Sequence, residues 1–257
     1  MADERKVEIE IEVDASPEVV WEALTNAEEL KRWFPLDARV KPGQGGSLWL
    51  SWGEGAEWES PIDIWKPGKH LRTVDEIPGK DGAPPTRVAV DYIIETREGK
   101  TILRLVHSGM AADTWEDEID TLNAGWTAFL IHLRHYLTLH RGEPRALAHY
   151  RHPAVSLTRP EAFRRTLDVL GIGDPTQLRA GGRYTAISRD GDRFEGEIRL
   201  LKAPINFTAT VENRRNAMLM VEIEPGRGKC RPAVWLSLYG EAGKDAAVAG
   251  KRIRKLL

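Results

Sequence analysis

The segment "GGSLWLSWGEGAEWESPIDIWKPG" (residues 45–68) returns in altered form as "GGRYTAISRDGDRFEGEIRLLKAP" (residues 181–204). A shift of 136 positions superimposes identical residues: Gly45 on Gly181, Gly46 on Gly182, Gly55 on Gly191, Glu59 on Glu195 and Lys66 on Lys202. Each segment has the pattern of two strands joined by a glycine-containing turn. The similarity has two explanations: any two hairpins with glycine turns look alike, or one domain has been duplicated.

The order of elements around the two hairpins favours duplication. A Pro-Glu helix precedes each one, "ASPEVVWEALTN" (15–26) in the first half and "TRPEAFRRTLDVL" (158–170) in the second. Strands and a final helix follow in both halves, and a long repeat of this kind is typical of tandem domains. We therefore predict domains at 1–145 and 153–257, with a boundary near "RALAHYRHP" and a short first strand "AVSL" (154–157) in the second domain.

The first half has a clear pattern of elements. "VEIEIEV" (7–13) alternates strictly, as a strand with one buried face does. Two short helices and about six strands follow, including "TRVAVDYIIET" (86–96) and "KTILRLVHSG" (100–109). Between residues 116 and 140 the apolar residues take helical spacing. The chain thus predicts an antiparallel meander that ends in one long helix.

Bulk composition excludes several classes of protein. The chain has 257 residues and a formal net charge of -2, which gives no electrostatic reason to expect binding to nucleic acid or to an acidic membrane. Cys230 is the one cysteine, so no internal disulfide forms and a reducing compartment is expected. Neither a signal peptide nor an apolar run of the ~20 residues that span a membrane is visible. We expect a cytoplasmic location.

Four motifs carry a family resemblance: "ASPEVVWEALTNAEELKRWF" (15–34), the Gly-Gly pair at 45–46, "GKTILRLVHSG" (99–109) and "GWTAFLIHLRHYL" (125–137). Through them the first 145 residues resemble the SRPBCC or START-like superfamily, and within it the activator-of-heat-shock-protein-90-ATPase homologues. The second half is similar only through the internal repeat, and it has Arg159 where the first half has Ser16. The resemblance implies an α+β fold of tandem helix-grip domains. Each would be an antiparallel sheet wrapped on a C-terminal helix, with a cavity between them.

The resemblance also implies a range of functions. Members of the superfamily bind lipids, sterols, polyketides or other apolar ligands, and some are cyclases or hydrolases. The eukaryotic namesake of the closer family is a chaperone cofactor with a different N-terminal domain, which is not recognisable in this sequence.

Catalytic signatures are scarce. The sequence lacks G-x-S-x-G, and "GRGKC" (226–230) is not a phosphate-binding loop. We expect no catalytic residue, metal or cofactor. The histidines at 132, 135 and 140 fit a solvated helix better than a metal site, and the carboxylates between 116 and 120 fit the helix dipole better than acid–base catalysis. Asp91 alternates with apolar neighbours and is expected to face solvent.

Aromatic residues suggest a ligand site in the first domain. Trp58, Ile62 and Ile64 share one phase of their strand, and His107 ends a strand in phase with Leu103 and Leu105. The expected lining of the cavity is Trp33, Trp58, Tyr92, His107, Trp126 and Leu130. The alternatives are ordinary core packing for the tryptophans and a hydrogen-bonded strand end for the histidine. Trp49 and Trp65 take the opposite phase, which predicts an apolar patch on the outer face.

Three functions follow from these features. The favoured one is a non-enzymatic protein that binds an apolar, lipid- or polyketide-like small molecule in the first domain. The second is a protein-interaction module with a chaperone or another protein as its partner. The third is a cyclase- or hydrolase-like enzyme that uses the same cavity.

Overall fold

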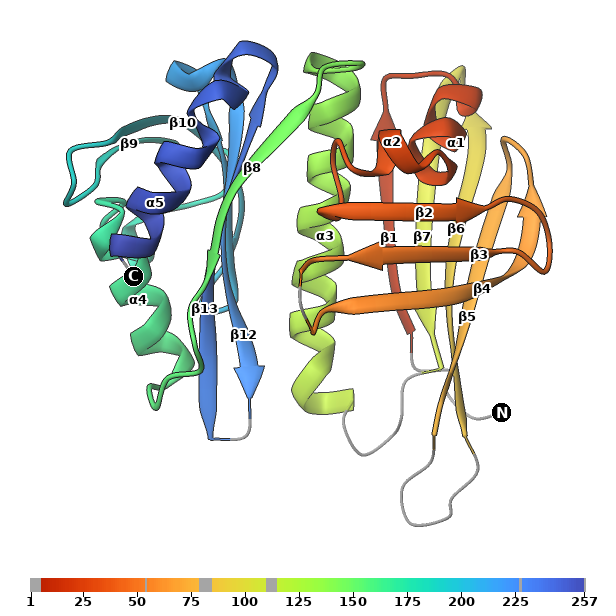
Figure 1. The fold of residues 1–257 in the computed structure, drawn as a ribbon, viewed down its shortest axis with the longest axis horizontal. Helices are drawn as coiled ribbons and strands as arrows, with labels where there is room; N and C mark the ends of the chain where they lie inside the picture. Colours follow the sequence, from red (N-terminus) through yellow and green to blue (C-terminus); the bar gives the residue numbers. More distant parts are fainter. Residues whose placement is uncertain (1–5, 54, 79–84, 110–114, 227, 257) are drawn as a thin grey trace. The chain divides into compact units, whose positions relative to one another are not determined.

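The computed structural model describes residues 6–53, 55–78, 85–109, 115–226 and 228–256, without the side chains of residues 115–118. The chain divides into two compact units, Met1–Arg141 and Gly142–Leu257. Each unit is an antiparallel sheet with a C-terminal helix (Figure 1). This confirms the α+β fold of two tandem helix-grip domains.

Unit 1 contains one seven-stranded sheet with the order β1-β7-β6-β5-β4-β3-β2. Its elements are β1 (Lys6–Val13), α1 (Pro17–Thr25), α2 (Ala27–Leu30), β2 (Asp37–Lys41), β3 (Ser47–Ser51), β4 (Glu57–Lys66), β5 (His70–Ile77), β6 (Thr86–Arg97), β7 (Lys100–Ser108) and α3 (Trp115–Leu139). The strand, two short helices, six strands and long helix predicted from the sequence are all present. The first strand, β1, forms one edge of the sheet and pairs with the last strand, β7.

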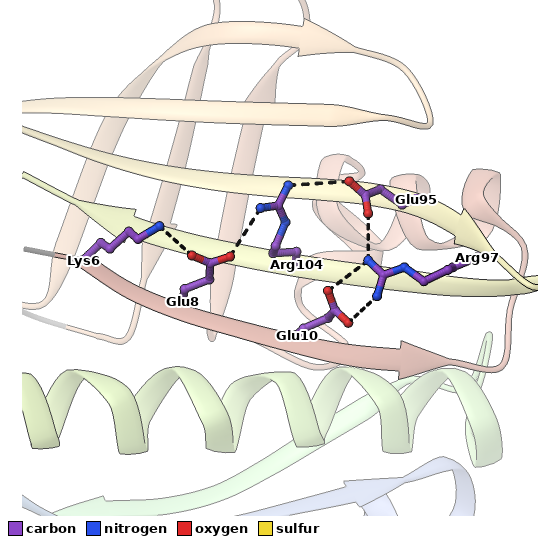
Figure 2. Close-up of polar contacts among 6 residues, drawn as sticks. All are labelled: Lys6, Glu8, Glu10, Glu95, Arg97 and Arg104. Carbon is purple, nitrogen blue, oxygen red and sulfur yellow. Dashed lines mark hydrogen bonds and ion pairs between the residues drawn. The ribbon is translucent and has the colours of Figure 1, made fainter. Parts of the chain in front are cut away.

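Charged side chains cover the outer face of β1, β7 and β6. Figure 2 shows a continuous chain of ion pairs, which we call the charge ladder, formed by Lys6, Glu8, Arg104, Glu95, Arg97 and Glu10. On the other face of the sheet Leu103 and Leu105 are fully buried. Strand alternation therefore places a solvated face opposite an apolar face, as the Glu-Ile pattern of β1 predicts.

Asp91 points to the outer face but is buried, with only 3% of its surface exposed, so the predicted solvent exposure was wrong. Arg72 lies opposite it on β5 and donates from Nε to Oδ1 at 2.7 Å and from Nη2 to Oδ2 at 3.1 Å. His70 Nε2 lies 2.6 Å from the same Oδ1. Two long cross-strand side chains cover the carboxylate, which sequence alternation cannot reveal.

Unit 2 contains a six-stranded sheet with the order β8-β13-β12-β11-β10-β9. Its elements are β8 (Arg145–Arg151), α4 (Arg159–Val169), β9 (Arg183–Ile187), β10 (Arg193–Lys202), β11 (Asn206–Val211), β12 (Ala217–Gly226), β13 (Lys229–Tyr239) and α5 (Ala246–Leu256). The stretch predicted as the boundary is thus strand β8, which pairs with β13. The predicted strand at 154–157 makes only an isolated bridge between Val155 and Cys230.

The internal repeat has the same backbone hydrogen bonds in both units. Gly45 N donates to Ile62 O and Ile62 N donates to Gly46 O, each at 2.9 Å. At the positions shifted by 136, Gly181 N donates to Ile198 O at 2.7 Å and Ile198 N donates to Gly182 O at 2.8 Å. Gly45 and Gly181 both have a positive φ, of 80° and 78°, which favours glycine. The similarity of the two segments therefore reflects one shared structure.

A β-bulge also recurs at the shifted position. The register slips between Ile62 and Ile64 in β4 and between Ile198 and Leu200 in β10. A bulge turns the following residues to the other face of the sheet, so Ile62 and Ile64 do not share a face as predicted. Trp65 consequently lies opposite buried Leu71 and is not part of an outer apolar patch.

Trp65 packs against the helix that begins the unit. Its ring lies 5.0 Å from the ring of Trp21 on α1, in an edge-to-face arrangement. Trp49 on β3 does take the opposite phase, and the guanidinium of Arg39 lies 4.3 Å from its ring centroid. A cation over the ring leaves less free apolar surface there.

The second unit begins its first helix with a capping box. Thr158 is the N-cap. Its hydroxyl accepts from the backbone N–H of Glu161, and the Glu161 carboxylate accepts from the backbone N–H of Thr158. Arg159 therefore follows the cap instead of replacing it, and its guanidinium donates to the carbonyl of Ile223 at 2.9 Å. In unit 1 the N-cap is Ser16, whose side chain makes no capping hydrogen bond.

In the part of the chain that the structure describes, none of the helices combines the length and the apolarity needed to cross a bilayer.

Replacement of Asp91 by Asn should destabilise unit 1, because it removes the charge of a buried carboxylate that Arg72 and His70 contact. We expect the free energy of unfolding to fall by about 1–3 kcal/mol. Tryptophan fluorescence during urea unfolding measures it, since eight of the nine tryptophans lie in unit 1.

The matched control is Glu10→Gln in the exposed charge ladder, which should change the same free energy by less than about 0.5 kcal/mol. An Asp91→Asn variant as stable as this control would show that the buried pairing contributes nothing to stability.

Candidate functional site

Aromatic rings fill much of the space between the sheet of unit 1 and α3. They form one network of ring contacts, which we call the aromatic cluster: Trp33, Phe34, Trp52, Trp58, Tyr92, His107, Trp126 and Phe129. Strands β4, β6 and β7, the segments after α2 and after β3, and helix α3 all contribute to it. The cluster thus joins residues that are far apart in sequence.

A side-chain hydrogen bond links α3 to the sheet. Trp126 Nε1 on α3 donates to His107 Nδ1 on β7 at 2.9 Å. The rings of Trp126 and Tyr92 also meet edge to face, 6.2 Å apart. His107 lies opposite Val90 of β6 and Val7 of β1, so its ring sits on the face of the sheet that contacts α3.

This hydrogen bond fixes the proton on the other nitrogen of His107. Since Nδ1 accepts, a neutral imidazole must carry its proton on Nε2. Nε2 is buried and has no hydrogen-bond partner among the described residues. Burial lowers the pKa of His107 to about 4, so the ring is neutral near pH 7. The site therefore offers one uncharged N–H donor without an acceptor.

Phe34 is the centre of the cluster, although the sequence did not single it out. Its ring stacks on Trp33 at 4.9 Å and meets Phe129, Trp52 and Trp126 at 4.7, 5.0 and 5.8 Å. Phe129 was also missed as a site residue, though its place one turn after Trp126 on the apolar stripe of α3 was a usable signal.

Three of the six predicted lining residues are almost fully buried. Trp33 is 1% exposed and donates from Nε1 to the carbonyl of Ala23 at 2.9 Å. Leu130 and Tyr92 are 1% and 5% exposed, and burial raises the pKa of the Tyr92 hydroxyl. These residues form walls, while Trp126 and His107 are only partly buried.

Trp58 lies at the edge of the cluster. Its side chain lies on the apolar face of the sheet, because Trp58 pairs with Leu50, but 54% of its surface is exposed. The ring of Trp52 connects it to the interior, at 5.3 Å from Trp58 and 6.2 Å from Phe129. The structure thus brings Tyr92, His107 and Trp126 into contact. Trp33 and Trp58 join them through other rings, and Leu130 is a buried residue of α3.

The predicted solvation of the helix histidines was wrong. His132, His135 and His140 are 3%, 6% and 4% exposed. The prediction assumed that one face of α3 meets water, whereas residues spaced along a second face, including Ala124, Ala128 and Ile131, are buried too. The carboxylates at 116–118 lie outside the described side chains. Among described residues, no three His, Cys, Asp or Glu side chains are placed to hold a metal.

The lowered pKa of His107 predicts a pH-dependent stability. The unfolded chain takes up this proton near pH 6.5 and the folded chain only near pH 4, so stability is full above pH 6.5 and falls as the pH drops towards 4. Between about pH 7.5 and about pH 4.5, we expect the free energy of unfolding to fall by roughly 1–3 kcal/mol more than in His107→Gln. Urea unfolding at both pH values measures this difference, and equal losses in both proteins would contradict the assignment.

A family model matches the first unit. Residues 14–138 match the model described as "Activator of Hsp90 ATPase homolog 1-like protein". Among curated proteins, no significant match is found.

Solved structures similar to this chain include single-domain and two-domain proteins. Protein MLL2253 from Mesorhizobium loti is 25% identical, covers 52% of this chain and 96% of its own, and has a TM-score of 0.45. The Aha1 dimer from Colwellia psychrerythraea is 24% identical over 53% of this chain and 98% of its own, with a TM-score of 0.46. BexL, a di-domain ARO/CYC from the BE-7585A biosynthetic pathway, is 14% identical over 98% of this chain and 93% of its own, with a TM-score of 0.46.

The identities and TM-scores are too low for any function to be inferred from these structures. The family match rests instead on the motifs that build the site, since it includes the first helices, strand β7 and most of α3. The resemblance predicted from the sequence motifs is thus confirmed for residues 14–138, which match the model of the Activator of Hsp90 ATPase homolog 1-like family.

Proposed function

We propose that unit 1 is a non-enzymatic binding domain for an apolar small molecule that carries one hydrogen-bond acceptor oxygen. The ligand lies between the sheet and α3, against Trp126 and Tyr92, and its oxygen accepts from His107 Nε2. Trp33 and Leu130 form the fixed wall behind it, and Trp58 covers the edge.

The unpaired Nε2–H of His107 carries this proposal. A buried donor without a partner costs about 1–3 kcal/mol, and a ligand oxygen in its place removes that cost. Nδ1 is already occupied by Trp126 Nε1, so the ring cannot turn over without losing a hydrogen bond. A carbonyl, hydroxyl or ether oxygen is a suitable acceptor, because the donor is neutral.

The surrounding rings supply the apolar part of the site. Trp52, Trp126 and Phe129 keep accessible surface although their rings meet inside the cluster. Covering this surface with a ligand contributes roughly 25 cal/mol for each Å² removed from water. Edge-to-face contacts join Trp52 and Phe129 to Phe34, at 5.0 and 4.7 Å between centroids, and Trp126 to Phe129 at 6.3 Å. A shift of one of these rings would admit a flat or extended apolar molecule.

One observation favours the enzymatic alternative. Asp75 on β5 lies opposite Val88, which shares the inner face with Val90, and Ser60 donates to its carboxylate at 2.8 Å. A second polar group therefore faces the same side of the sheet as His107. Strand β6 separates the two, so at least about 9 Å lies between them across the sheet. A cyclase- or hydrolase-like reaction would need a substrate that spans this distance, and the binding function needs only His107.

Unit 2 is proposed to act as a scaffold. Apolar side chains, among them Phe163, Leu167, Tyr184 and Phe207, form one continuous buried core between its sheet and helices. The interaction with a chaperone or another protein remains the alternative for the whole chain, and a cytoplasmic location remains a prediction.

Ligand binding is tested with native mass spectrometry of the purified chain and with titration of a fluorescent apolar ketone. We expect a co-purifying apolar molecule and saturable uptake of the ketone. His107→Phe keeps an aromatic ring but removes the Nε2–H donor, together with the Nδ1 acceptor of Trp126, so it should weaken ketone binding by about tenfold. Trp49→Phe, on the outer face, is the matched control and should bind as the native chain does.

Two results would contradict the proposal: no bound molecule together with no ketone uptake, or equal affinity in His107→Phe and in the native chain. If the native chain is fully folded but has no bound molecule and takes up no ketone, protein interaction becomes the favoured function. Turnover of the bound molecule that is lost in Asp75→Asn would instead establish the enzymatic alternative.

A further inference from the structure

A hollow of about 480 Å³ opens on unit 2, at the margin of the core described above. It lies where α4, the segment after β8, the turn after β9 and the end of α5 come together. Its apolar part is formed by Val155, Leu157, Val169 and Leu256. Sites for small ligands commonly have volumes of about 300–1,000 Å³, so the hollow is large enough to hold one.

Apart from Thr166, whose hydroxyl donates to the carbonyl of Ala162, the described polar side chains of the hollow are basic. Arg165 projects from α4 and Arg189 from the turn after β9, and His152 follows β8. The backbone N–H of Arg189 donates to the carbonyl of Val169 at 3.1 Å, which holds this turn against the end of α4. Among the residues that the structure describes, no carboxylate lines the hollow.

The two guanidinium groups have no hydrogen-bond or ion-pair partner among the described residues, whereas most arginines of this unit have one. The nearest acids of the same turn are already engaged: Asp190 pairs with Lys255, and Asp192 pairs with Arg214 and Arg252. Glu161, one turn before Arg165 on α4, attracts its charge but is hydrogen-bonded in the capping box with Thr158. The hollow therefore has two guanidinium groups without a direct ion pair beside an apolar surface.

We propose that this hollow binds a carboxylate with an apolar tail, such as a medium-chain fatty acid. Arg165 and Arg189 hold the carboxylate through charge-assisted hydrogen bonds, for which a planar guanidinium is suited. The tail lies on Val155, Leu157, Val169 and Leu256 and is removed from water. The site is independent of the ligand site proposed in unit 1, because all of its residues belong to unit 2.

NMR of the full chain tests the proposal, with decanoate as the probe and the Nε–Hε signals of the arginines as the readout. Titration should shift the signals of Arg165 and Arg189, which single substitutions assign, and the shifts should saturate. Arg165→Gln/Arg189→Gln should lower the affinity for decanoate by at least about tenfold. Decyltrimethylammonium, with the same tail and the opposite charge, should not shift these signals.

Arg164→Gln/Arg179→Gln is the matched control, since it removes two exposed arginines of the same unit that do not line the hollow. It should leave decanoate binding unchanged, and so should Trp126→Phe in unit 1. The proposal is overturned if the two signals do not move, or if the control double variant loses as much affinity as the hollow variant. It is also overturned if inorganic phosphate competes as well as decanoate, because the apolar surface would then contribute nothing.

Discussion

The hydrogen bond from Trp126 to His107 links the long helix of unit 1 to its sheet, and the chemistry of the site depends on it. It needs an unprotonated Nδ1, so it is compatible with a neutral imidazole only. Burial favours the same protonation state by lowering the pKa to about 4. Both effects leave Nε2–H as a fixed donor among aromatic rings, and a binding function follows from that donor.

The two units share the backbone structure of the hairpin and differ in the side chains of their interiors. The Gly-Gly hairpin, its hydrogen bonds and its β-bulge recur at a shift of 136 positions. The helix that closes the sheet has 25 residues in unit 1 and 11 in unit 2. Unit 1 places partly accessible aromatic rings under its helix, whereas unit 2 packs a continuous apolar core and leaves a basic hollow at its surface. Duplication of one fold has thus produced two different interiors.

Much of the fold could be predicted from the sequence, because alternation and helical spacing are local patterns. They located β1, α1, α3 and the meander, and the repeat located the second unit. Local patterns failed where a residue's surroundings come from distant strands. The bulge in β4 reversed the face of Trp65, cross-strand partners buried Asp91, and β8 was taken for a boundary because its apolar residues are few.

The candidate site was predicted in part for the same reason. Strand phase indicated that His107 points the same way as Leu105, and helical spacing indicated that Trp126 faces the sheet. The hydrogen bond between them depends on how far α3 lies along the sheet, which no pattern encodes. Phe34, at the centre of the cluster, follows a short helix in an irregular segment and has no periodic signal.

The protonation state of His107 is the central claim, and ¹⁵N NMR of the histidine rings tests it most directly. His107→Gln identifies the signals of this residue. At neutral pH we predict an unprotonated Nδ1 and a protonated Nε2, with the Nε2 signal shifting when an apolar ketone binds. A proton on Nδ1, or a doubly protonated ring at neutral pH, would contradict the account of the site.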